Sequence, residues 1–134
     1  MTGLASFQRR MRAIPKAARE AVAPALAQGA YEVAEAIERL APEDTGDLKG
    51  SVAVTLPGKP TPPYSQPGGS RTLGELEAAV TVGNTDVRYP HLVEYGTVTA
   101  PAQPFFWPGF RLARGKAERR IKAAIGKAIR EARR

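Results

Sequence analysis

The stretch that decides the fold is residues 16–40, KAAREAVAPALAQGAYEVAEAIERL. Its apolar residues recur every three or four positions and its charged residues fall on the opposite side, which is the pattern of an amphipathic helix with one buried stripe. We therefore predict a helix from Lys16 to Leu40. Pro24 is expected to kink the helix or delay its start, and Pro42 ends it, since the residue before a proline avoids helical angles. The predicted buried stripe consists of Val22, Leu26, Ala30, Val33, Ile37 and Leu40.

After this helix the periodicity changes to alternation. Residues 51–56 and 76–82 alternate apolar with polar or small side chains, which predicts two half-buried strands. Between them, residues 57–72 contain five prolines and three glycines, so we expect a long flexible loop without regular structure. A short helix or strand is expected at 89–97, and a terminal helix at 109–134. The predicted fold class is α+β, with a small antiparallel sheet packed against long N-terminal and C-terminal helices.

Length and composition set the domain organisation. With 134 residues, no cysteine and one histidine, the chain is expected to form a single domain, 1–134, without disulfides or thiolate metal sites. Residues 1–15 are interpreted as an N-terminal arm or short helix. No apolar run reaches the roughly 18 to 20 residues that cross a bilayer, so no membrane contact is expected.

The net charge of +7 is concentrated in one segment. Residues 111–134 carry ten basic and two acidic side chains, whereas the remaining chain is close to neutral. Three interpretations of this basic helix stay open: a solvated amphipathic face, a phosphate-binding surface for nucleic acid, or a subunit or partner contact. The side chains available for DNA or partner contact are Arg114, Lys116, Arg119, Arg120, Lys122 and Lys127.

Motifs with possible chemistry give little support for an enzyme. Asp44-Thr45-Gly46 matches the tripeptide of aspartic proteases, but it lies in a polar segment rather than on the apolar strands that such carboxyls need. A turn in which Gly46 takes a positive φ is the favoured interpretation. His91 has no second histidine with which to bind a metal, and no phosphate-binding loop or dinucleotide motif is present. We therefore expect no enzyme activity, no metal and no cofactor.

Six of the aromatic side chains lie between residues 89 and 110. A packed core junction and an exposed interaction patch both remain possible for this segment. In either case Gly96 is expected to allow a tight turn, and Tyr95 to pack with Phe105 and Trp107.

Taken together, several motifs in a fixed order resemble one family. They are Leu40-Ala41-Pro42, then Asp44-Thr45-Gly46-Asp47-Leu48-Lys49-Gly50-Ser51, then Val82-Gly83, Tyr89, Val93-Glu94-Tyr95-Gly96-Thr97, and Pro101-Ala102-Gln103-Pro104-Phe105 before a final helix. From about residue 4 to 130 this arrangement resembles the siphophage tail-component family, the small neck proteins described as tail completion, tail terminator or head–tail joining proteins.

The resemblance implies a structural virion protein at the head–tail junction. It implies a ring of about six copies that caps the tail tube and docks the head connector, assembled in the bacterial cytoplasm, in a phage or a phage-like gene transfer agent. The alternative is a DNA-binding accessory protein that uses the basic C-terminal helix. Candidate ring or partner contacts are Glu94, Tyr95, Tyr64, Lys59 and Arg71, with Glu94 expected to form an intersubunit salt bridge; the motif residues Asp44, Thr45, Gly46, Gly96, Thr97, Pro104, Phe105 and Trp107 are expected to be structural.

Overall fold

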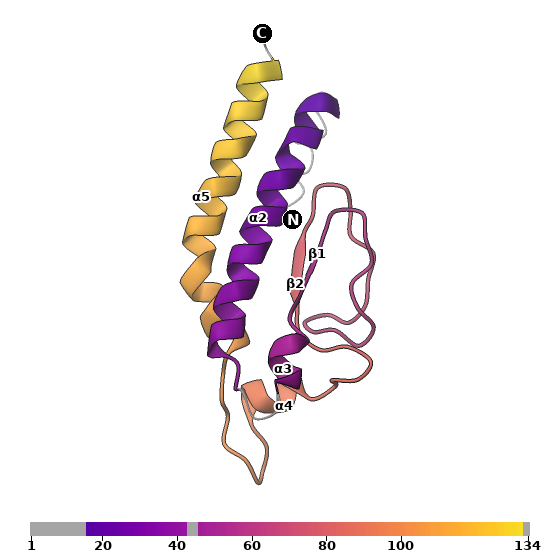
Figure 1. The fold of residues 1–134 in the computed structure, drawn as a ribbon, viewed down its shortest axis with the longest axis vertical. Helices are drawn as coiled ribbons and strands as arrows, with labels where there is room; N and C mark the ends of the chain where they lie inside the picture. The colour runs from indigo at the N-terminus through magenta and orange to yellow at the C-terminus, as the bar shows by residue number, and fades with distance from the viewer. Residues whose placement is uncertain (1–15, 43–45, 133–134) are drawn as a thin grey trace, which may run out of the picture.

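The computed structural model describes residues 16–42 and 46–132. Two long helices, α2 (Lys16–Leu40) and α5 (Phe106–Ala132), lie side by side and antiparallel along the length of the molecule (Figure 1). A two-stranded antiparallel sheet of β1 (Ala53–Thr55) and β2 (Ala79–Thr81) lies against α2, with Val54 opposite Val80. The α+β fold class predicted from the sequence is confirmed.

Two short helices occupy the end of the molecule where α2 finishes and α5 starts. They are α3 (Asp47–Gly50) and α4 (Pro90–Tyr95), and the loop between α4 and α5 projects beyond them (Figure 1). Gly46, just before α3, has φ of +81°, as predicted for this turn. Asp44 and Thr45 lie outside the described residues, as do the predicted short helix and arm at residues 1–15.

The main core lies where α2, the sheet and the start of α5 meet. Ile37 and Phe105 are fully buried there, and Val82, Leu48 and Ala117 complete it. The two long helices approach most closely at Gly109, where an added Cβ would stand 2.6 Å from the Cα of Ile37. A smaller apolar cluster of Val22 and Ala128 joins the helices farther along. The predicted stripe of α2 is thus largely the buried one, except that Leu40 is exposed.

Pro24 does not delay α2, which begins eight residues earlier at Lys16. Both strands are shorter than expected. At β1 the backbone N–H groups of Ser51 and Val52 donate to the carbonyls of Leu48 and Lys49, so these residues belong to the end of α3 rather than to a strand. The alternation of residues 51–56 predicted that the apolar side chains of this strand would be buried and the polar ones exposed. The structure differs, because Thr55 is buried and Leu56 is exposed.

The segment 57–72, expected to lack regular structure, forms an irregular hairpin. The Thr61 N–H donates to the carbonyl of Arg71 at 2.8 Å, and the Leu73 N–H to that of Lys59 at 2.9 Å. The Thr61 hydroxyl also accepts from the Arg71 N–H at 2.8 Å. An isolated bridge between Gln66 and Val82 attaches the hairpin to the sheet. Prolines remove single donors, but the residues between them keep theirs, and these make the pairing.

Candidate assembly surface

The start of α5 is capped by a carboxylate that comes from another helix. Glu94, in the last turn of α4, accepts from the Phe105 and Phe106 N–H groups at 2.9 Å and from the Trp107 N–H at 3.3 Å. The next residue, Pro108, has no N–H. Glu94 therefore accounts for the donors that the first turn of a helix leaves without partners, and its negative charge lies at the positive end of the α5 dipole.

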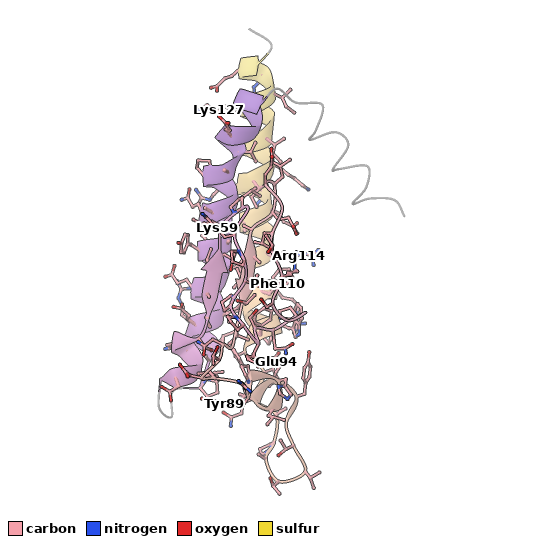
Figure 2. All side chains as sticks on the ribbon, turned by 90° about the vertical axis from the view of Figure 1, so that its right-hand side faces the viewer. Lys59, Tyr89, Glu94, Phe110, Arg114 and Lys127 are labelled. Carbon is pink, nitrogen blue, oxygen red and sulfur yellow. The ribbon has the colours of Figure 1, made fainter. Side chains whose placement is uncertain are left out.

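Glu94 is only 7% exposed, and both of its carboxylate oxygens have partners within the chain. Glu94 therefore has an intramolecular role, and the intersubunit salt bridge expected from the sequence stays a prediction. Its buried position fixes α4 relative to α5. Figure 2 shows Glu94 near the end of the molecule opposite to Lys127.

Around this cap the expected aromatic packing is present in part. Phe105 and Phe106 are buried, whereas Trp107 and Phe110 are half-buried. The Trp107 indole N–H donates to the Tyr95 hydroxyl at 2.9 Å, and the Trp107 ring packs edge-on against Phe106 and Phe110. The aromatic segment thus combines the two interpretations left open by the sequence: one side is core and the other reaches the surface.

The loop of residues 96–104, between α4 and α5, is ordered by its own hydrogen bonds. The Thr97 side-chain oxygen accepts from the Thr99 and Ala100 N–H groups, and the Thr97 N–H donates to the Ala100 carbonyl at 2.8 Å. Gly96 has φ of +78°, and a Cβ there would stand 2.7 Å from the Ala102 backbone nitrogen. Only glycine fits both the conformation and the space. Pro104 is exposed on the same loop.

This end of the molecule exposes apolar side chains. Tyr95 is 69% exposed although its hydroxyl is held by Trp107, and Val98 at the tip of the loop is fully exposed. Tyr89 and Leu92 add to the surface. We call α4 together with residues 96–104 the projecting end. Large exposed apolar side chains gathered on a rigid part of a protein are typical of a contact surface.

Sequence reasoning did not find Leu92 or Val98 as contact candidates. In α4 the apolar residues Leu92 and Val93 are neighbours on the chain, so they lie on different faces of the helix. Val93 packs against the core and Leu92 points outward. The sequence signal that could have identified Leu92 as a contact candidate is therefore its position outside the buried apolar stripe of a short helix.

The other candidate contacts lie in the hairpin 57–72, which borders α4 at Gln66 and Pro67. Tyr64 is exposed, and the Arg88 guanidinium lies 3.8 Å from its ring centroid. Arg71 is paired with Glu77 at 3.1 Å. The pKa of Glu77 is lowered, first by the hydrogen bond from the Gly74 N–H and then by that from Arg71. Lys59 is exposed on the same hairpin (Figure 2).

The six basic candidates of α5 are spread around the helix. Arg114 pairs with Glu118 at 3.0 Å and Arg120 with Glu32 of α2 at 2.7 Å, so these two contribute to the intramolecular structure. The other four are exposed and have no ion-pair partner within residues 16–42 and 46–132: Lys116, Arg119, Lys122 and Lys127.

A groove of about 300 Å³ lies between α2, α5 and β2. Trp107, Phe110 and Ile121 form one side and Leu26 and Val33 the other. The described residues contain no cluster of three or more metal-ligating side chains. None of the described helices is both long and apolar enough to span a bilayer.

These features define a small α+β protein in which the buried Glu94 carboxylate joins α4 to the start of α5, and in which the projecting end exposes apolar side chains. Such a protein is suited to assembly with other proteins. A family model, HK97-gp10-like, described as a bacteriophage HK97-gp10 tail component, matches residues 5–96. The match covers more than half of the chain, and the protein belongs to this family of phage tail components. No curated protein and no solved structure matches the chain.

Membership in the family confirms the resemblance found in the sequence and makes the protein a structural component of a phage tail, and hence of the virion. The matched segment runs from residue 5 through α2, α3, the sheet and α4 to Gly96. The rest of the projecting loop and the whole of α5 lie beyond it. The basic helix and Val98 therefore lie outside the matched segment.

Proposed function

We propose that the protein is a tail terminator or tail completion protein. In this role a ring of about six copies caps the end of the tail tube and offers a docking surface for the head connector, in a phage or a phage-like gene transfer agent. Assembly takes place in the bacterial cytoplasm. Two facts support this proposal: the chain belongs to a family of phage tail components, and it carries a rigid apolar end that no described part of the chain covers.

The projecting end is the observation that carries the proposal. The Glu94 cap, the Tyr95–Trp107 hydrogen bond and the Thr97 turn hold the exposed side chains in place before any partner binds. A preordered surface loses little conformational entropy on binding, so its apolar area contributes efficiently to affinity. We assign the projecting end to contact with the tube.

The hairpin 57–72 is proposed as a second partner surface. Tyr64, Lys59 and Arg71 are exposed on it. A protein that joins two different partners needs two different surfaces. We assign the hairpin to the head connector.

Leu92→Asp and Val98→Asp variants test the role of the projecting end. We expect each to lose most of the capping activity, because a carboxylate placed in an apolar contact must give up its hydration. Purified tail-tube protein is polymerised with each variant, and tube lengths are measured in negative-stain images. The wild type is expected to stop elongation and give short tubes of uniform length.

Leu56→Asp is the matched control. Leu56 is exposed to nearly the same extent as Leu92, 40% against 45%, but lies just after β1 rather than on the projecting end. It should cap tubes as the wild type does. Capping by Leu92→Asp and Val98→Asp at the wild-type level would refute the assignment of this surface, and a wild type that never shortens tubes would refute the proposed function.

The exposed cations of α5 favour a second candidate, a DNA-binding accessory protein. Lys116, Arg119, Lys122 and Lys127 could each neutralise a phosphate and release a counterion. We expect any such binding to weaken steeply with salt. Affinity for duplex DNA is measured between about 50 and 200 mM salt, with Lys122→Gln/Lys127→Gln as the test variant. Affinity that does not depend on salt, or that the variant retains in full, would remove this candidate.

A further inference from the structure

Two helix faces of this chain carry charges of opposite sign at the same spacing. On α2, Tyr31, Glu35 and Glu38 follow one another at positions i, i+4 and i+7; we call these residues, with Val52 and Val54 of β1, the acidic face. On α5, Leu112, Lys116 and Arg119 follow at i, i+4 and i+7; we call them the basic face. Each face therefore has one large apolar residue and two like charges, and both charge pairs are three residues apart, about 4.5 Å along a helix.

The acidic face is open and partly apolar. Tyr31 is more than half exposed, and a shallow depression of about 260 Å³ lies between it, Glu38 and the two valines of β1. Glu35 is paired at 2.6 Å with Arg39, and both side chains are largely exposed. Such an exposed pair contributes little to stability, so Glu35 can take a new partner at small cost. Glu38 has no ion-pair partner among the residues that the structure describes.

The basic face is equally open. Leu112 is 74% exposed, which is unusual for a leucine in a helix that contributes to the core. Lys116 and Arg119 are exposed and without ion-pair partners in the described part of the chain. An apolar residue flanked by unpaired cations on a rigid helix indicates a contact with an acidic protein surface.

The acidic face lies on α2 and β1, and the basic face lies on α5. The acidic face borders β1, whereas α5 packs on another side of α2, with Ala113 and Ala117 toward it. Glu35 borders a depression that Leu112 and Lys116 line from α5, but its ion-pair partner is Arg39, and no ion pair joins the two faces within the described part of the chain. Two different complementary surfaces on one subunit are what a head-to-tail ring requires.

We propose that the basic face of one copy binds the acidic face of the next and that this contact closes the ring. The inference rests on the proposed function, because it names the surfaces by which the ring is built. In a ring whose axis runs along the helices, α5 of each copy is antiparallel to α2 of its neighbour, as it is within one chain (Figure 1). Glu35 then faces Arg119, Glu38 faces Lys116, and Tyr31 covers the exposed Ala123.

DNA is the other polyanion that the basic face could bind. The copy-to-copy contact is favoured because the chain itself holds an acidic counterpart of equal spacing, and because a phosphate backbone offers no apolar partner for Leu112. The charges that the contact does not use, such as Lys122 and Lys127, stay available for other partners.

Charge reversal on each face tests the contact. Glu35→Lys/Glu38→Lys makes both faces basic, and Lys116→Glu/Arg119→Glu makes both acidic. Each variant alone should repel itself, and we expect the concentration for half-assembly to rise about tenfold or more. A 1:1 mixture should assemble again, because copies of the two kinds alternate and every contact then joins opposite charges.

Assembly is measured on the full chain by sedimentation velocity and native mass spectrometry at low ionic strength, with circular dichroism to show that each variant is folded. Asp86→Lys is the control, since it reverses an exposed charge outside both faces, and it should assemble as the wild type does. Recovery in the mixture would support the inference even if either variant were less stable.

Three results would overturn the contact. If both double variants form rings alone, the faces are wrongly assigned, although the ring and the capping role stand. If assembly is unchanged but Lys116→Glu/Arg119→Glu abolishes binding to duplex DNA, the basic face is a phosphate surface. If the wild type stays monomeric both in solution and on tube ends, the inference and the proposed ring both fail.

Discussion

Glu94→Ala should lower the free energy of unfolding by about 3 kcal/mol, since buried N–H groups left without acceptors cost about 1–3 kcal/mol each and such effects do not add fully. The Phe105, Phe106 and Trp107 N–H groups would lose their acceptor together. For a chain of this size the melting temperature should fall by roughly 10 °C. Urea unfolding followed by circular dichroism provides the measurement.

Two controls separate the cap from a general loss of charge. Glu94→Gln keeps the shape and one acceptor oxygen but presents an amide donor to the Trp107 N–H, so its loss should be smaller, about 1–2 kcal/mol. Glu118→Ala removes only an exposed pair with Arg114, 3.0 Å long, and should change stability by less than about 0.5 kcal/mol. A Glu94→Ala protein as stable as Glu118→Ala would show that water can replace the carboxylate.

The second large effect is expected at the crossing of the two long helices. Gly109→Ala places a Cβ 2.6 Å from the Cα of Ile37 and 2.8 Å from its backbone nitrogen. Backbone atoms cannot rotate away as a side chain can, so α2 and α5 must separate. We expect a loss of about 2–3 kcal/mol, measured by thermal and urea unfolding.

The same substitution in the same helix gives the control. At Gly115 an added Cβ meets only the end of the flexible Arg119 side chain. Gly115→Ala should therefore stabilise the protein by about 0.5–1 kcal/mol through helix propensity. If Gly109→Ala stabilises the protein as Gly115→Ala does, helix propensity rather than packing decides the outcome and the close approach at Gly109 is not a constraint.

The sequence predicts those elements whose signal is local and repeated. The 3.6-residue period of residues 16–40 extends over 25 residues and marks α2 from end to end. α3 has only four residues, too few to establish a period, and it was missed. The strands were predicted in the right places but too long, because hydrogen bonds to preceding turns use residues such as Ser51 and Val52.

The start of α5 shows why the candidate site was harder to predict. The hydrophobic pattern of the sequence predicted that the terminal helix starts at Gly109. In the structure α5 begins at Phe106, because Glu94 provides acceptors from another helix. The same contact is a role of Glu94 that the sequence did not indicate, because a lone glutamate in a polar motif gives no sign of its burial. The sequence also does not show which apolar residues are exposed, since Val93 and Leu92 differ only in the side of α4 on which they lie.

Ile37 of α2 packs with Gly109 and Phe105, which come much later in the chain, and this separation affects the order of folding. Helix α2 is synthesised early and α5 late, so the apolar face of α2 stays without its main partner until the last quarter of the chain has been made. Closing so long a segment makes folding slower than in a protein built from local contacts. A chain interrupted before Phe105 lacks a third of the buried residues of its main core and the groups that Glu94 caps, so subunits become competent for assembly only after synthesis of α5.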